Sequence, residues 1–211
     1  MREQLQSDFD KIVKTSKFSN KEIQLKKDFL NKFIESGFPN RKQEDWKFLD
    51  ISQIIKKNIS DLSYFIDYSQ SNKIDPFTFV DDLEHNKIIF LNGRIEKIDF
   101  NHEDKSKIEI SDETKKKISF NYENSLIDLN SAFTDKVFKI LVKKDYSLKK
   151  PLIIYHSTND SIKSTNINLR LDFELGENSC LKLIDYFTNN TTKNFINIFY
   201  NFNLEKDSIL K

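Results

Sequence analysis

The sequence predicts a chain of the α+β, mainly β class, with a helical region at the N-terminus and solenoid strands stacked after it. Three observations lead to this prediction. Apolar residues recur at helical spacing in the first third, alternating strands dominate after residue 136, and a repeat runs through the last part. We therefore divide the chain into a helical region, residues 1–75, and the start of a strand-rich core, residues 76–211, with a helical insertion near 122–133.

The helix after residue 19 has the clearest start and stop signals. Ser19 and Glu22 form a capping box, and Gly37 followed by Pro39 ends the helix. Its apolar face consists of Leu25, Phe29, Leu30, Phe33 and Ile34. We expect an earlier helix through Leu5, Phe9, Ile12 and Val13. A short helix around residues 51–55 is expected to be capped by Asp50 or Ser52.

The middle of the chain alternates short strands with charged segments. A strand over residues 88–91 leads into Asn92-Gly93, a dipeptide typical of a tight hairpin turn. Residues 105–117 are charged, so we expect them to be exposed. Leu126, Leu129 and Phe133 are spaced as on a helix, which predicts the insertion near 122–133.

Two long strands are predicted by strict alternation after residue 136. Over 166–175 the apolar face is Ile167, Leu169, Leu171, Phe173 and Leu175, and a second strand repeats the pattern with Ile196, Ile198, Tyr200, Phe202 and Leu204. The second strand also carries Phe195 and Phe199 on its other face. A partner surface, a covering helix or crowding in another layer would each explain them.

The repeat aligns residues 142–149, 175–182 and 204–211. Each copy has an aliphatic strand end, a turn and a new apolar strand ending in Leu-Lys. The turn residues Asp145, Asn178 and Asp207 are 33 and 29 positions apart, a period typical of solenoids. The third copy stops at Lys211, and a solenoid needs a terminal cap. We therefore expect this chain to be the N-terminal part of a longer protein.

Composition gives little electrostatic evidence for a partner. The net charge is +1 with 32% charged residues, which does not favour nucleic acid or an anionic membrane. Cys180 is the only cysteine, so no intrachain disulfide can form and a reducing compartment fits. The sequence shows no signal-peptide core and no apolar run of about 18 residues. We expect a soluble, cytoplasmic protein.

Several motifs resemble those of one family. Residues 39–48 contain Pro39, Arg41, Lys42, Glu44, Trp46, Lys47 and Phe48, which match Pro-x-Arg-Lys-x-Glu-x-Trp-(Lys/Arg)-(Tyr/Phe). This signature is similar to one near the N-terminus of the SufD family, subunits of the iron–sulfur cluster assembly scaffold. Four further segments resemble the family in the same order: residues 90–94, 129–133, 150–153 and 175–179. The departures are Asn40 and Leu49, where the family often has Thr, and the sister SufB family usually lacks the Trp segment.

The resemblance implies a fold and partners. It implies an N-terminal helical region, a right-handed parallel β-helix and a C-terminal helical region, in a complex with SufB and the ATPase SufC. The cluster-related residues and the ATPase contact of the family lie beyond the part that this chain matches. The resemblance therefore assigns no catalytic, cofactor-binding or metal residue here, and the iron–sulfur cluster belongs to the assembled complex.

The family segment is the candidate interface motif. Arg41, Lys42, Glu44 and Trp46 could form a recognition element, because Arg and Trp are frequent interface anchors. We favour a structural interpretation, in which Trp46 holds the helical region against the strands and the charged residues pair locally.

The other candidates are interpreted as structural or solvated. Cys180 aligns with the apolar Ile209, which indicates a packing role rather than a cluster ligand. His156 is expected to point outward from its strand without a ligand partner, and His85 and His102 are expected to be solvated. The Lys115-Lys116-Lys117 run is interpreted as a solvated face, and the isolated glycines form no phosphate loop.

The resemblance therefore implies a non-catalytic scaffold subunit that pairs with SufB-like and SufC-like proteins. Two alternatives stay open at this point. One is a β-helix carbohydrate-active enzyme such as a polysaccharide lyase or hydrolase, and the other is a plain solenoid interaction module.

Overall fold

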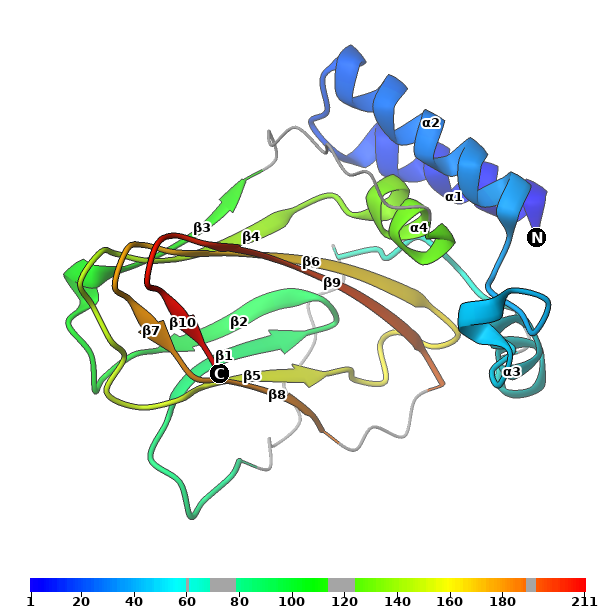
Figure 1. Cartoon of the computed structure of the whole chain (residues 1–211). Coiled ribbons are helices and arrows are strands. Elements are labelled where there is room, and N and C mark those ends of the chain that lie inside the picture. The colour runs from blue at the N-terminus through cyan, green and yellow to red at the C-terminus, as the bar shows by residue number, and fades with distance from the viewer. Residues whose placement is uncertain (60, 69–78, 114–123, 189–192) are drawn as a thin grey trace.

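A computed structural model describes residues 1–59, 61–68, 79–113, 124–188 and 193–211, and Figure 1 shows its arrangement. The helices are α1 (Arg2–Thr15), α2 (Asn20–Ser36), α3 (Ile51–Asn58) and α4 (Ser125–Phe133), with short 3-10 turns η1 (Glu44–Trp46) and η2 (Lys105–Lys107). The strands are β1 (Asn86–Leu91), β2 (Arg94–Asp99), β3 (Ile108–Glu113), β4 (Val137–Val142), β5 (Leu152–Ser157), β6 (Asn166–Leu175), β7 (Cys180–Leu181), β8 (Leu183–Phe187), β9 (Phe195–Leu204) and β10 (Ile209–Leu210). The predicted division near residue 75 falls outside the described residues.

The capping signals read from the sequence are confirmed. The side chain of Ser19 accepts from the Glu22 backbone, the Glu22 carboxylate accepts in return from the Ser19 backbone, and Gly37 ends α2 with φ +69°. Asp50, rather than Ser52, caps α3 by accepting from the Gln53 backbone at 2.9 Å. The ends of these helices are therefore set by capping residues that lie next to them in the chain and can be identified from the sequence.

The helices pack together on one side of the strands. In Figure 1, α4 lies between α2 and the sheets. The cluster that joins them includes Leu5, Phe9, Leu30, Phe33, Leu129 and Phe133. Lys26 of α2 is buried, and its ammonium donates to the carbonyl of Ser131 at 3.0 Å and to that of Thr134. Burial lowers the pKa of Lys26 to about 8, and these bonds tie α2 to the last turn of α4.

Two four-stranded sheets face each other over the main core. Their strand orders are β2-β1-β5-β8 and β3-β4-β6-β9, and β7 pairs with β10 in a separate two-stranded sheet. Both four-stranded sheets are mixed, since β1–β2 and β3–β4 are antiparallel whereas the other pairs are parallel. Phe90 of β1 and Phe138 of β4 meet edge to face across the core with their ring centroids 5.2 Å apart.

The predicted right-handed parallel β-helix is wrong. Within the described residues the sheets are open and mixed, and none is closed or solenoid-like. One physical reason lies at Asn92-Gly93, where both residues have positive φ (52° and 81°) and turn β2 back against β1. The second is β3, which occupies residues expected to form an exposed charged segment and runs antiparallel to β4.

The repeat instead corresponds to parallel pairing in a constant register. Asn166 pairs with Phe195 and Leu175 pairs with Leu204, so β9 follows β6 at an offset of 29 residues along their whole length. Cys180 pairs with Ile209 at the same offset, as the alignment of the repeat predicted. The repeat thus places matching segments side by side, although the sheets that contain them stay open.

Buried carboxylates hold the connecting segments. Asp8 of α1 is fully buried and accepts from the backbone of Tyr64 at 2.9 Å and from the ammonium of Lys11 at 2.8 Å. Glu103 accepts from Tyr146 Oη at 2.7 Å and from the backbone N–H groups of Lys149 and Lys150 at 3.1 and 3.0 Å. The bonds of Glu103 hold the chain just before β5, and the bond from Tyr64 to Asp8 holds the segment around Tyr64 against α1.

Candidate protein-interaction sites

Two surfaces emerge as candidate interaction sites. The first, which we call the open edge, consists of the outer strands β8, β9 and β10. The second, which we call the motif hollow, lies where the Arg41–Trp46 segment meets α2 and α4. In Figure 1, α2 and α4, which border the hollow, lie at the helical end of the molecule, whereas β10 lies at the other end.

The open edge exposes side chains that the neighbouring strands bury. Leu171, Phe173 and Leu175 of β6 are fully buried, whereas their partners on β9 are half-buried or exposed: Phe202 is 39% exposed and Leu204 47%. Ile184 and Phe187 of β8 and Ile209 of β10 are also exposed. The core between the two sheets therefore lies open along β9 and β8.

The aromatic rings of the open edge form a stack. Phe202 lies against Phe173 with ring centroids 5.2 Å apart, and Tyr200 is parallel to Phe202 at 6.0 Å. Long edge strands with exposed apolar side chains favour pairing with another polypeptide. The edge thus has the properties of a protein-binding surface.

Helices cover the other face of β9 near the start of the strand. Phe195 packs against the helical cluster and meets Phe38 edge to face at 5.7 Å. Asn130 of α4 donates to the carbonyl of Leu169 at 3.0 Å and to that of Asn197 at 2.8 Å. Of the three explanations for Phe195, the covering helix is therefore the one that the structure shows.

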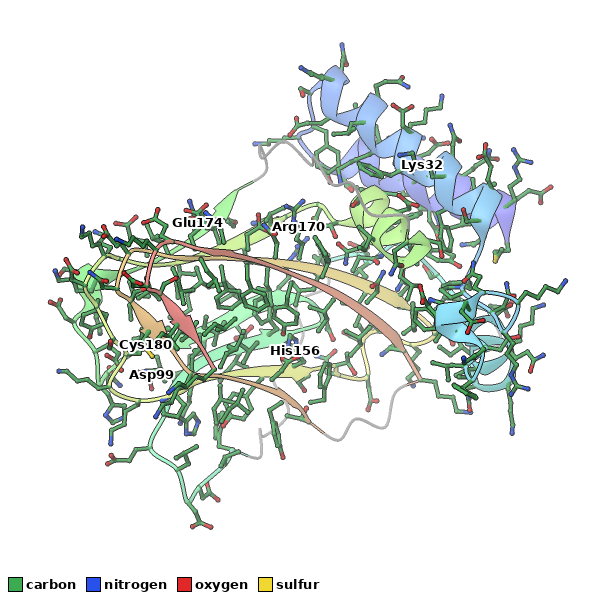
Figure 2. All side chains as sticks on the ribbon, in the orientation of Figure 1. Lys32, Asp99, His156, Arg170, Glu174 and Cys180 are labelled. Atoms are coloured by element: carbon green, nitrogen blue, oxygen red, sulfur yellow. The ribbon has the colours of Figure 1, made fainter. Side chains whose placement is uncertain are left out.

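His156 lies inside the molecule, and the expected outward orientation is wrong. It is 3% exposed, and its Nε2 lies 2.7 Å from Asp185 Oδ1 and 3.2 Å from Tyr200 Oη. Its ring stacks between Phe90 and Phe187. Figure 2 shows His156 on β5. A sequence signal was available, because Leu152, Ile154 and His156 share one parity and Leu152 and Ile154 face the core.

His156 therefore links three strands at the open edge. Asp185 belongs to β8 and Tyr200 to β9, so the imidazole joins the two sheets where the core is exposed. Burial raises the pKa of Tyr200 far above its usual range, with a further contribution from Asp185, which keeps the phenol protonated. The arrangement holds the edge strands in position.

The remaining histidines and the cysteine differ in their surroundings. His85 is buried, contrary to expectation, and its Nε2 lies 2.7 Å from Tyr155 Oη. His102 is exposed, as expected. Cys180 is a partly exposed free thiol beside β10 (Figure 2). The described part of the chain contains no group of three or more His, Cys, Asp or Glu that could hold a metal ion. Lys115-Lys116-Lys117 lies outside the described residues.

The candidate motif lies on the surface at η1. Arg41, Lys42 and Glu44 are exposed, and Trp46 is half-buried. Glu44 pairs with Lys47 at 2.8 Å, which is the local pairing expected of the motif for one of its charged residues. Trp46 lines the motif hollow together with residues of α2 and α4, so the structure places it beside helices. Phe48, just after the motif, is 86% exposed.

The motif hollow has a volume of about 560 Å³ and collects acidic side chains from three elements. Its lining includes Lys32, Glu35, Glu44, Asp45, Trp46, Ser125 and Asp128. Burial raises the pKa of Asp128, whereas the nearby Lys32 opposes that shift. Ser125 is 7% exposed, and its hydroxyl has no hydrogen-bond partner within the described chain. Sequence reasoning missed this site because its carboxylates come from separate helices.

Comparison of the chain with protein-family models and with curated proteins gives no match. None of the helices in the described residues is long and apolar enough to span a membrane. The likeness to SufD therefore rests on the motifs alone.

Proposed function

We propose that this chain is a non-catalytic scaffold subunit for iron–sulfur cluster assembly in the cytoplasm, which pairs with a SufB-like protein and works with a SufC-like ATPase. The observation that carries the proposal is the open edge, where Phe202, Leu204 and Phe187 are exposed along strands whose inner neighbours are buried. Such an edge favours a macromolecular partner. The ordered motifs between residues 38 and 182 suggest which partners these are.

The proposal does not depend on a closed solenoid. It needs a firm surface that a second subunit can contact, and two features support such a surface. The β9 strand is paired with β6 over ten residues, and His156 joins β8 and β9 through Asp185 and Tyr200. The ATP hydrolysis and the cluster would belong to the partners.

Co-purification with the SufB-like and SufC-like proteins encoded in the same genome tests the proposal. We expect the tagged chain to retain the SufB-like protein. Leu204→Asp should abolish retention, because it places a charge on the open edge. Ile98→Asp is the matched control, because the exposed fraction of Ile98 is 46% and that of Leu204 is 47%. Ile98 belongs to β2, which forms the edge of its sheet opposite to β8 and is therefore not part of the open edge.

Circular dichroism should confirm that both variants keep the wild-type fold. Failure of the unmodified chain to retain either protein would contradict the proposal. Equal retention by the two variants would contradict the assignment of the open edge.

A further inference from the structure

We infer that the motif hollow binds an arginine side chain presented by a partner protein. This surface is separate from the open edge, and the inference does not depend on the proposed role in cluster assembly. It rests on the charge of the hollow, on its single indole and on the buried polar group in its wall.

The lining has a marked excess of negative charge. Among the described residues, four acidic residues, Glu35, Glu44, Asp45 and Asp128, line the hollow together with one lysine, Lys32. Glu44 is partly neutralised by Lys47. Asp128 is half-buried, and Lys32 compensates the cost of burying its carboxylate only in part, because burial still raises the pKa of Asp128. An added positive charge would offset this cost, so the charge of the hollow complements a cation.

The indole of Trp46 selects among cations. A planar guanidinium can stack on an aromatic face while it donates two parallel bonds to a carboxylate, and an ammonium cannot do both. Trp46 lines the hollow together with Asp45 and Asp128, which places a ring and carboxylates around one space. The volume of about 560 Å³ accommodates an arginine side chain with part of its backbone.

Ser125 supplies an independent observation. It lines the hollow at the first turn of α4, and its Oγ is buried with no hydrogen-bond partner among the described residues. A buried hydroxyl without a partner is uncommon, since most such groups are bonded to protein or water. A ligand that donates hydrogen bonds, as a guanidinium does through five N–H groups, would satisfy it once the wall moves enough to expose the buried Oγ.

Trp46 also serves as the fluorescent probe for the binding experiment, because it is the only tryptophan in the chain. Its fluorescence is titrated with the peptide acetyl-Gly-Arg-Gly-amide at constant ionic strength. We expect a saturable change. The same peptide with citrulline, which is neutral and nearly isosteric, should give a response at least tenfold weaker, and the lysine peptide should fall between them.

Variants of the wall locate the site. Glu35→Gln combined with Asp128→Asn should weaken the arginine response at least tenfold. Glu96→Gln, a matched loss of an exposed carboxylate on β2, should leave the response unchanged. The absence of a saturable change, an equal response to citrulline, or an undiminished response in the double variant would each overturn the inference. None of these outcomes bears on co-purification through the open edge.

Discussion

Strands β6 and β9 have the same alternating pattern and pair residue for residue, yet they differ in what covers them. Leu171, Phe173 and Leu175 of β6 are fully buried. At the offset of 29 residues, Phe202 and Leu204 of β9 are 39% and 47% exposed. The alternation of residues determines which side of a strand is apolar. The elements packed against that side determine whether it is shielded from water. The inner strand is thus part of the core, whereas the outer strand is a surface that remains available.

The largest expected difference between β6 and β9 is in the effect of removing phenylalanine rings at paired positions. Phe173→Ala should lower the free energy of unfolding by about 3–5 kcal/mol, because it leaves a cavity in the core. Phe202→Ala, at the paired position, should cost only about 1–2 kcal/mol, because its ring is already partly exposed. Urea unfolding of both variants gives the two values. Equal losses would mean that β9 is buried in solution.

The second test concerns the anchor of the inner strand β5. Glu103 is buried, and burial disfavours the charged form of its carboxyl. Hydrogen bonds from Asn86, from Tyr146 and from the backbone of residues 149–150 favour the charged form more strongly, so the pKa of Glu103 lies below its usual value. Glu103→Gln should therefore lower the free energy of unfolding by about 2–3 kcal/mol at pH 7.

The pH dependence of that loss has a definite sign. The folded pKa of Glu103 is lower than the unfolded one, so its carboxylate stabilises the fold above the unfolded pKa, and this contribution disappears as the pH falls through the folded value. The difference between wild type and Glu103→Gln should shrink in urea titrations at about pH 3. Glu96→Gln on exposed β2 serves as the control and should show little difference at either pH. A loss that stays constant with pH would exclude the charged bonds as its cause.

Part of this arrangement could be predicted from the sequence. The capping box at Ser19, the Asn92-Gly93 hairpin and the strand over 166–175 were predictable because each depends on residues close together in the chain. The β-helix was not correctly predicted. A repeat indicates which segments pair. Whether the paired strands close into a solenoid depends on the connections between strands and on the edge strands, which the repeat does not determine.

The candidate sites show the same limit. Arg41, Lys42, Glu44 and Trp46 were identified as a motif, but Glu44 and Trp46 line the hollow together with α2, which precedes the motif, and with α4, which lies far along the chain. Asp128 and Ser125 enter the motif hollow only through the packing of α4 on α2. Similarly, His156 meets Asp185 through the register of β5 on β8, and it meets Tyr200 across the core from the other sheet; neither contact could be read from spacing.

A third test compares matched positions at the strand ends. Gly176 and Glu205 follow Leu175 and Leu204, which are paired. A Cβ at Gly176 would lie 2.6 Å from the backbone nitrogen of Lys144, so Gly176→Ala should cost about 1–3 kcal/mol. Glu205→Ala, at the outer position, removes only the exposed bond that the Glu205 carboxylate accepts from the Glu177 backbone at 3.1 Å, so it should cost less than about 1 kcal/mol. Thermal unfolding measures both, and a harmless Gly176→Ala would show that the inner turn can move apart.

The smallest test uses the turn residues, where the backbone is the same and only the neighbours differ. Asn178 and Asp207 both have left-handed φ (59° and 57°), which glycine adopts freely. The Asn178 side chain also donates to Asp145 Oδ1 at 2.9 Å, across to the preceding turn. Asn178→Gly should therefore cost about 0.5–1 kcal/mol.

Asp207→Gly removes a side chain at the outermost turn, and the relief of left-handed strain should offset the added flexibility of the unfolded chain. We expect its stability to stay within about 0.5 kcal/mol of wild type in urea unfolding. A loss at residue 207 as large as that at residue 178 would mean that the outer turn has a partner in solution. The open edge would then already be covered, and the distinction between β6 and β9 would not hold.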